Sequence, residues 1–452
     1  MDNAARLKEN RMGVEPISGL LVKMSFPIMV SMMVMALYNV VDSIFVSRIG
    51  EDALTAVSMC FPIQQAMIAI SVGTGVGIGA LLSRFLGARD FERVDEIAKN
   101  GIFLAVCSYF LFVIIGFFAE PFIAVQTDNK IIIEYGSTYL YIVCFFSITI
   151  FIQIVMEKLL QGTGQTKYIF LVQVSGAIIN IIMDPILIFG MFGAPKLGVA
   201  GAAYATVFGE AFAASLGLYF NTKKNKEINL NMKGFKPNWK EIKDIYRIGL
   251  PSVILQSVAS VMVFGFNKIL VSFTTSAVAV FGVFFRLQSF IFMPVFGISS
   301  AVIPIAAYNY GARKRERIET TMRLSTVYAV AMMSIGTIAF WLFPKQLLGI
   351  FNPSEEMIKI GVWALRIISV GFPMAGYAIL RGSIFQSLGK SVYSMNISLV
   401  RQLGIILPSA FLLSKLGNIN YVWFSFLIAE IIGISMSVMY TYKIRREIIN
   451  QI

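Results

Sequence analysis

The sequence predicts an all-α integral membrane protein with twelve transmembrane helices in two parallel repeats of six. Three observations lead to this fold class. Hydrophobic residues make up 57% of the chain and charged residues only 14%, with a mean hydropathy of +0.75, a composition that soluble domains do not have. Apolar segments long enough to cross a bilayer recur along the whole chain. Short motifs from the first half also return in the second half at a constant spacing.

The apolar segments have the length that a membrane-spanning helix needs, about 20 residues. In the first half they cover residues 18–46, 53–83, 98–122, 132–160, 168–191 and 198–220. In the second half they cover residues 246–272, 277–308, 319–344, 358–388, 392–414 and 419–441.

The repeat is carried by two pairs of loop motifs. LGARDFERV at 86–94 matches YGARKRERI at 310–318, and QGTGQT at 161–166 matches QSLGKS at 386–391. Equivalent segments are separated by six spans, an even number, so both halves cross the membrane in the same direction. Parallel repeats of this kind occur in alternating-access transporters.

The repeat predicts a first six-helix lobe over residues 1–221 and a second over 242–452. The intervening basic stretch, residues 222–241, is predicted to be a solvated cytoplasmic linker.

Most of the 38 Lys and Arg residues lie in alternate loops. This bias predicts a multi-pass protein of the cell membrane with both termini in the cytoplasm. A net charge of +13 would suggest a nucleic-acid partner in a soluble protein. Here membrane topology accounts for the charge, so the expected partners are the lipid bilayer and a small molecule, without nucleic acid.

Asp184 is a carboxylate inside the fifth apolar segment. A charge at the centre of a span costs about 2.5–3.5 kcal/mol, so something must compensate it. Asn180 lies on the same helix face, four residues earlier, and Pro185 leaves the carbonyl of Ile181 without its helical donor. These oxygens can gather around a cation or a proton. The alternative is a structural aspartate that accepts hydrogen bonds from a neighbouring helix.

Asp42 and Thr206 are predicted to lie at a similar depth to Asp184. Asp42 is six residues before Arg48 at the outer end of the first span, roughly 9 Å below that surface at a rise of 1.5 Å per residue. Thr206 is about 12 Å from the outer end of the sixth span by the same count. Two carboxylates in one apolar layer cannot both stay ionised without a cation or a proton between them. We therefore expect Asp42, Asn180, Asp184 and Thr206 to form one site.

Pro27 permits a bend in the first span, which also carries Asp42, so helix shape and protonation can be coupled there. The alternative is a static proline, which is common in transmembrane helices. Pro185 is the corresponding conformational candidate in the fifth span.

The second half carries cations within its spans: Lys268, Arg286, Arg366, Arg381 and Arg401. Glu430 is the only clear acid there. We expect a structural network in which Glu430 pairs with one of these cations and others extend toward the membrane surface.

The chain has no histidine. This excludes histidine metal ligands and histidine proton relays, and leaves carboxylates as proton carriers. No HExxH or GxSxG motif is present, so an intramembrane enzyme is not expected. No cofactor and no metal are expected, apart from Na⁺ as one possible coupling ion.

With these residues identified, the chain resembles the multidrug and toxic compound extrusion family of secondary transporters. The resemblance runs through SFPIMV, NVVDSIFVSRIG, LGARDFERV, LQGTGQT, NIIMDPILIFG, GVAGAAYATV, PIAAYNYGARK and FQSLGKS, which together cover nearly the whole chain. It implies two six-helix lobes in a V around a central cavity. It also implies export of lipophilic cations in exchange for H⁺ or Na⁺.

The resemblance is strongest to the subgroup whose ion site lies in the N-terminal lobe, and its motif residues fall on Asp42, Asn180, Asp184 and Thr206. Glu210 stands where an uncharged amide is expected. It is therefore an additional candidate ligand.

Two neutral residues, Asn39 and Tyr204, are further candidate ligands. Another branch of the family has an acidic site on the seventh and tenth spans. This chain has Lys268 and Arg366 on those spans, so a second site there is not expected.

The predicted function is that of a drug and cation antiporter that works as a monomer. The alternative is a flippase for a lipid-linked precursor, which would need cations in its cavity for a pyrophosphate. The paired acids favour the antiporter, whereas Arg286 and Arg401 in the second half are the cations that a flippase would use.

Overall fold

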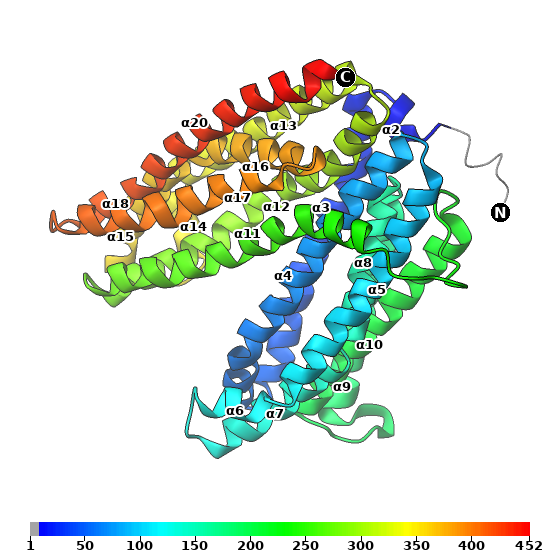
Figure 1. Cartoon of the computed structure of the whole chain (residues 1–452). Coiled ribbons are helices and arrows are strands. Elements are labelled where there is room, and N and C mark those ends of the chain that lie inside the picture. The colour runs from blue at the N-terminus through cyan, green and yellow to red at the C-terminus, as the bar shows by residue number, and fades with distance from the viewer. Residues whose placement is uncertain (1–8) are drawn as a thin grey trace. The chain divides into compact units, whose positions relative to one another are not determined.

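The computed structural model describes residues 9–452 as helices joined by short turns (Figure 1). No β-strand occurs within these residues. Ten helices are each long and apolar enough to cross a membrane, and two bent helix pairs bring the number to twelve. The predicted all-α membrane fold with twelve spans is therefore confirmed.

The helices of the first half follow the predicted segments closely. They are α2 (Arg11–Val14), α3 (Ile17–Ser47), α4 (Glu51–Gly87), α5 (Phe91–Gly116), α6 (Ala119–Ala124), α7 (Lys130–Phe145), α8 (Ile148–Gly162), α9 (Thr166–Phe189), η1 (Met191–Gly193), α10 (Val199–Tyr219) and η2 (Phe220–Lys224). Both α3 and α9 continue through their internal prolines, Pro27 and Pro185.

The second half repeats this order. Its helices are α11 (Trp239–Val271), α12 (Thr275–Gly311), α13 (Arg315–Leu342), α14 (Pro344–Gly349), α15 (Glu355–Ser369), α16 (Phe372–Ser387), α17 (Ser391–Leu399), η3 (Val400–Ile406), α18 (Leu407–Ser414), α19 (Ile419–Val422), α20 (Phe424–Glu447) and η4 (Ile449–Gln451). The segment η3 is a π-helix, a form that in most proteins is short and associated with functional positions.

The fourth span of each half is broken. In the first half α7 and α8 meet at an angle of 47°, and in the second half α15 and α16 do so at the same angle. The second break lies next to Gly371 and Pro373, and Pro373 stands in the first turn of α16, where its missing N–H does no harm. The first break, at Phe146 and Ser147, has no proline. Each of the predicted spans 132–160 and 358–388 is therefore formed by a bent pair of helices.

The two copies of each repeated loop have the same backbone conformation. Arg89 and Arg313 both have positive φ, at 59° and 56°, in the two GAR loops. Gly164 and Gly389 have φ of 78° and 76° in the QGTGQT and QSLGKS loops. Positive φ is uncommon outside glycine. Its recurrence at equivalent arginines shows that the repeat extends to local geometry.

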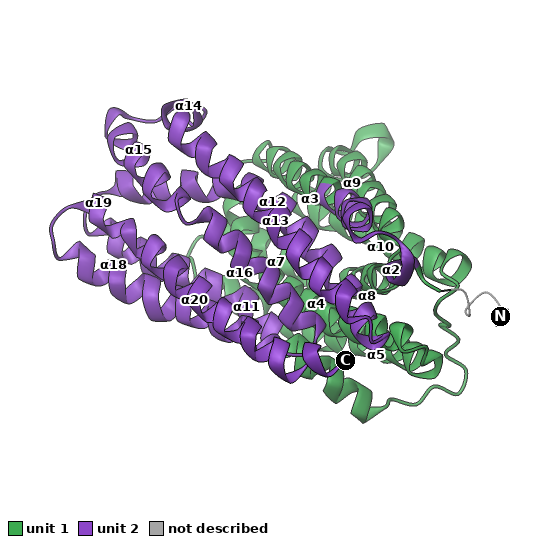
Figure 2. Cartoon of the chain, turned by 90° about the horizontal axis from the view of Figure 1, so that it is seen from above, with its two compact units in different colours: residues 1–10, 30–250 green, residues 11–29, 251–452 purple. Residues whose placement is uncertain are grey.

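The chain forms two compact units (Figure 2). Within the described range, residues 9–10 and 30–250 form unit 1, and residues 11–29 and 251–452 form unit 2. The predicted lobes differ from these units, because the first half of α3 belongs to unit 2 and the first part of α11 belongs to unit 1. Both transitions lie beside a proline, Pro27 or Pro251. The first eight residues of the predicted first lobe lie outside the described residues.

Glycine contacts explain why these helix halves pack where they do. A Cβ added to Gly77 of α4 would lie 2.2 Å from the carbonyl oxygen of Ile245, and one added to Gly249 would lie 2.8 Å from that of Gly73. Small residues four apart thus let α4 and the first part of α11 approach closely within unit 1. Within unit 2, a Cβ on Gly297 of α12 would lie 2.2 Å from Cγ of Met29.

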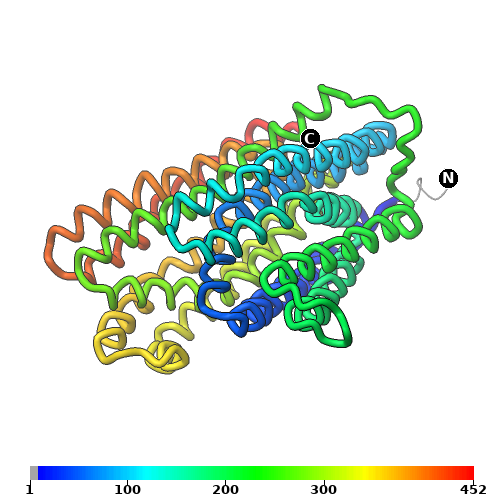
Figure 3. Tube along the Cα trace, turned by 90° about the horizontal axis from the view of Figure 1, so that it is seen from below, coloured from blue at the N-terminus to red at the C-terminus, as the bar shows by residue number. Residues whose placement is uncertain are grey.

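The predicted linker is packed along unit 1 rather than being only a solvated connection (Figure 3). The backbone N–H of Asn229 donates to Asp95 at 2.7 Å, and that of Asn238 donates to Asn100 at 3.0 Å. The Asn238 side chain also donates to Glu96 at 2.9 Å. All three acceptors lie on α5, so this helix holds the segment through Asn229 and Asn238.

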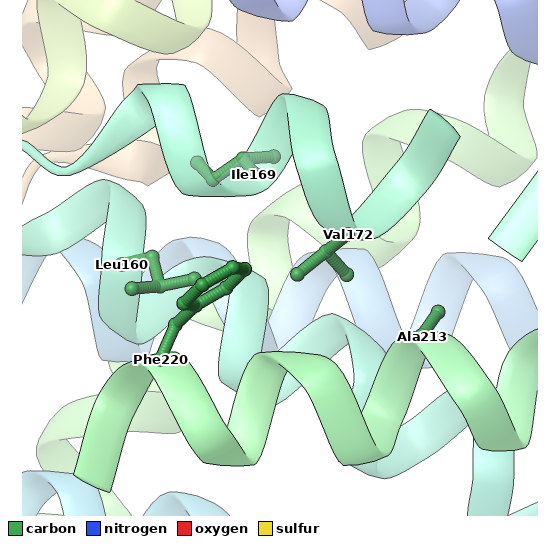
Figure 4. Close-up of a cluster of buried hydrophobic side chains, with 5 residues drawn as sticks. All are labelled: Leu160, Ile169, Val172, Ala213 and Phe220. Atoms are coloured by element: carbon green, nitrogen blue, oxygen red, sulfur yellow. The ribbon is translucent and has the colours of Figure 1, made fainter. Parts of the chain in front are cut away.

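An apolar cluster fixes the helices that carry the candidate site. Its members come from α8, α9, α10 and the start of η2 (Figure 4): Leu160, Ile169, Val172, Ala213 and Phe220. All five side chains are buried. Their burial anchors α8, α9 and α10 to one another, at about 25 cal/mol per Å² of apolar surface removed from water.

We predict that Gly77→Ala lowers the thermal unfolding midpoint of the purified protein in detergent. The added methyl group would meet the backbone of Ile245, and overpacking of this kind costs about 1–3 kcal/mol. Gly282→Ala is the matched control, because its Cβ would meet nothing within 4 Å. The control should unfold at the wild-type temperature or slightly above it. Equal midpoints for both variants would contradict the close α4–α11 packing.

Candidate ion-binding site

The centre of the site is the face of α9 that carries Asn180 and Asp184. Both side chains are buried, with 3% and 0% of their surface exposed. They share one face because they are four residues apart in a continuous helix.

Close packing of α10 against α9 brings Thr206 to this face. A Cβ on Gly209 would lie 2.8 Å from the carbonyl oxygen of Gly176, and a Cβ on Gly176 would lie 3.1 Å from that of Gly209. At this contact the Asn180 side chain donates to the hydroxyl oxygen of Thr206 at 3.5 Å. The Thr206 hydroxyl in turn donates to the carbonyl of Ala202 at 3.1 Å. Its oxygen therefore faces α9 as an acceptor.

Asp42 reaches the same region from α3. Its carboxylate is close enough to that of Asp184 for the two charges to interact. Tyr38, one turn earlier, interacts electrostatically with Asp42, Asp184 and Glu210. The C-terminal ends of α3 and α9 also meet through Phe45 and Phe189, whose ring centroids are 6.4 Å apart. The structure thus brings the four main predicted residues together within unit 1.

The site contains several buried oxygens that receive no hydrogen bond. They are both carboxylate oxygens of Asp184, the side-chain oxygen of Asn180 and Oδ1 of Asp42. Buried polar atoms in native proteins almost always have a partner, and an unmatched group points to an ion, a water or a proton. Ionised carboxylates and amide oxygens only accept. The unmatched set is therefore complementary to a hard cation or a proton.

Glu210 lies beside this cluster on a small cavity. The cavity has a volume of about 40 Å³ and is lined from α3, α8, α9 and α10 by Met35, Tyr38, Gln153, Gln173, Gly176, Ala177, Asn180, Thr206, Gly209 and Glu210. A water needs roughly 10–15 Å³ by this measure, whereas drug-sized pockets are of the order of 300–1,000 Å³. The cavity suits ions and water, not a drug.

The two neutral candidate ligands, Asn39 and Tyr204, lie outside the cavity lining. Asn39 is exposed, and its backbone carbonyl accepts from the Ser43 hydroxyl. The ring of Tyr204 contacts the ring of Phe146, with centroids 6.1 Å apart. Neither residue lines the cavity. Their candidacy as ligands stays a prediction without support from this geometry.

Sequence reasoning missed three polar residues that line the cavity. Tyr38 carries a usable signal, because it lies one turn before Asp42 on the same helix. Gln153 and Gln173 are amides inside predicted spans, and both donate to Glu157, at 3.0 and 2.8 Å. A search for polar side chains of every kind inside spans, not only acids, finds all three.

Four of the five intramembrane cations of unit 2 contact an acid or an aromatic ring, and the fifth, Arg286, is exposed. Arg401 donates to both carboxylate oxygens of Glu430, at 3.0 and 3.2 Å, which confirms the expected pairing of Glu430 with a cation. Lys268, Arg366 and Arg381 each lie over an aromatic ring, with ring centroids 5.0, 5.9 and 4.7 Å away. Rings stabilise cations in this way.

Comparison with known proteins agrees with this architecture. The MatE family model matches residues 27–186 and again residues 251–412, so it finds the internal repeat as well as the family. A multidrug export protein, MepA, of Staphylococcus haemolyticus is 25% identical over 94% of this chain and 93% of its own length.

Two solved structures have a similar fold at 25% identity. One is the outward-facing conformation of a multidrug resistance MATE family transporter, with a TM-score of 0.88 and 99% of each chain covered. The other is a MOP superfamily transporter from Pyrococcus furiosus, with a TM-score of 0.87 and 97% of each chain covered. The latter is described as having a binding pocket of reverse polarity that suggests a different function.

The two family matches cover well over half of the chain and coincide with its two repeats. The twelve spans and the full-length likeness to multidrug transporters point the same way. The chain is therefore a multi-pass membrane transport protein that belongs to the MatE family of multidrug efflux transporters.

Proposed function

We propose that this transporter is a secondary active antiporter that exports amphipathic cations in exchange for H⁺ or Na⁺. The coupling ion would bind Asp42 and Asp184, with Asn180 and Thr206 as neutral oxygen ligands. The observation that carries the proposal is the set of buried oxygens without donors on α3 and α9. Oxygen acceptors that no side chain satisfies suit a hard cation or a proton as their partner.

The flippase alternative requires a cationic surface for a pyrophosphate. In unit 2, Arg401 is neutralised by Glu430, and Lys268, Arg366 and Arg381 are directed to aromatic rings. In unit 1, the site residues are acids and neutral oxygens. These features support a cationic substrate. The likeness to the Pyrococcus furiosus protein, with its reversed pocket polarity, shows that pocket charge has to be judged for each chain.

The proposal places the protein in the cell membrane with both termini in the cytoplasm. In this proposal the protein functions as a monomer. It is a transporter and not an enzyme, because no step of the proposed cycle needs covalent chemistry or a cofactor.

We predict that Asp184→Asn abolishes ion-coupled ethidium efflux while the protein still folds and reaches the membrane. Asparagine keeps the shape of aspartate but removes the charge that the ion neutralises. The measurement is ethidium transport into inverted vesicles under separately imposed proton and sodium gradients. Asp128→Asn, a change at an exposed aspartate, is the control and should transport normally. Wild-type coupled transport by Asp184→Asn would leave that residue with a structural role only.

We predict that ethidium affinity in detergent falls as pH falls, and that Asp42→Asn flattens this dependence. Protons and a cationic substrate compete for the same carboxylates, so protonation removes the attraction. Binding is followed by ethidium fluorescence across a pH series, repeated at a low and a high sodium concentration. Sodium-dependent binding without any pH dependence would keep the site and identify the coupling ion as Na⁺. The same slope in the wild type, Asp42→Asn and Asp184→Asn would place coupling elsewhere.

The proposed topology puts both GAR loops on the cytoplasmic side. Single cysteines at two exposed, repeat-related positions, Glu92→Cys and Glu316→Cys, should react with an impermeant maleimide only in inverted vesicles. Asp128→Cys in the opposite loop should react only in intact cells. All three are made in a background without native cysteines. Labelling of the two GAR positions from opposite sides would refute the parallel repeat.

A further inference from the structure

The broken fourth span of each repeat is contacted by an acidic side chain from the last span of that repeat. In unit 1, Glu210 of α10 is hydrogen-bonded to Thr149, which begins α8 just after the α7–α8 break. In unit 2, Glu430 of α20 lies against the α15–α16 break, since a Cβ added to Gly371 would be 2.9 Å from its Cγ. The two acids thus hold related places.

The two acids differ in what neutralises them. Glu430 is paired with the guanidinium of Arg401, which projects from the π-helical segment η3. No ion pair to Glu210 is found among residues 9–452, and its partner is the neutral Thr149 hydroxyl at 2.7 Å. Unit 2 therefore supplies a cation, Arg401, for the acid at its helix break. The acid at the break of unit 1, Glu210, has a neutral partner instead.

The hydrogen bonds around Thr149 indicate that Glu210 carries a proton. Its hydroxyl oxygen is 2.7 Å from Glu210 Oε2 and also 2.8 Å from the carbonyl oxygen of Phe146. A threonine hydroxyl has one hydrogen. If Glu210 were ionised, one of these two short oxygen–oxygen contacts would contain no hydrogen and would be repulsive. If Glu210 carries a proton, it donates to Thr149 and Thr149 donates to Phe146, so both contacts are hydrogen bonds.

The remaining neighbours of Glu210 provide no fixed positive charge. Tyr38 of α3 lines the cavity and interacts electrostatically with Glu210, Asp42 and Asp184. The cavity residues Gln153 and Gln173 donate to a further acid, Glu157 of α8.

The cations of the packed helices lie elsewhere. Lys158 is nine residues beyond Thr149, about 13 Å along α8, and donates to Gln161. Lys130 and Lys167 stand at the far first turns of α7 and α9.

The cavity links Glu210 to the Asp42–Asp184 cluster. Asn180 lines it, is 97% buried, and has a side-chain oxygen without a donor. At about 40 Å³ the cavity holds water or a proton-carrying water chain but not a drug. An exchangeable proton can therefore reach Glu210 through it.

We propose that Glu210 is a second proton-binding carboxylate of unit 1, distinct from the Asp42–Asp184 cluster, and that it holds its proton against Thr149 at the break in the fourth span. The inference rests on the proposed function for its role in coupling, because a second exchangeable proton raises the number of protons exchanged for each drug cation. Its protonation by itself does not depend on drug transport. The two aspects are tested separately.

Protonation is tested by infrared spectroscopy of the full-length protein in detergent near neutral pH, which separates the C=O stretch of a carboxylic acid from the bands of carboxylates. A carboxylic acid component should be lost in Glu210→Gln and shifted in Thr149→Val, which removes its hydrogen-bond partner. The component should persist in Asp184→Asn and in the exposed control Glu134→Gln. A Glu210→Gln spectrum identical to that of the wild type would overturn the proposal, whatever the transport activity.

Coupling is tested by the slope of log ethidium affinity against pH, which counts the protons exchanged on binding. We expect a slope approaching about two in the wild type and about one in Glu210→Gln. Glu134→Gln should keep the wild-type slope. An unchanged slope in Glu210→Gln would overturn the role of Glu210 in coupling. An unchanged slope in Asp184→Asn would instead overturn the proposed function, while the infrared result would still decide whether Glu210 carries a proton.

Discussion

Burial of the Asp184 carboxylate is the constraint on which the organisation of unit 1 depends. A charge inside a span must be matched, and the surrounding oxygens of Asn180 and Thr206 can share a cation or proton but cannot supply one. A fixed arginine would satisfy the same constraint permanently, as Arg401 does for Glu430. The difference matters for a transporter, because an ion that leaves can carry energy between conformations, whereas a tethered guanidinium cannot.

The two repeats share a backbone plan and differ in chemistry. The GAR loops, the positive-φ turns and the broken fourth spans recur with nearly the same angles. The last span of each repeat also brings an acid to the break. Within residues 9–452, Asp42, Asp184 and Glu210 of unit 1 form no ion pair, whereas Glu430 of unit 2 is paired with Arg401. Parallel repeats therefore allow one unit to carry an exchangeable site while the other keeps a fixed charge pair, without any change of fold.

Part of this arrangement was predictable from the sequence and part was not. Membrane spans, the repeat and the Asp42–Asp184 layer follow from hydropathy, spacing and helical rise, which act locally. The α15–α16 break has a signal in Gly371 and Pro373, but the α7–α8 break has none, since Phe146 and Ser147 are compatible with a helix. That break depends on packing that no local pattern records.

The assignment of helix halves to compact units was also beyond local reasoning. Hydropathy identifies each span but not its packing partner. The glycine faces at Gly73 and Gly77 become informative only when the residues opposite them are known. Asn39 illustrates the same limit, because it neighbours Tyr38 in sequence yet points to the exposed side of α3. Depth along a helix can be estimated from the sequence more reliably than the direction in which a side chain points.

The break in the fourth span gives the charge state of Glu210 a structural consequence. A protonated Glu210 allows Thr149 to bond the carbonyl of Phe146, and an ionised Glu210 takes the same hydrogen for itself. The hydroxyl at the start of α8 therefore has two arrangements, selected by one proton. Since Phe146 lies at the break itself, the proton bears on the geometry at which α7 and α8 meet. Coupling between ion binding and helix shape needs such a two-state element.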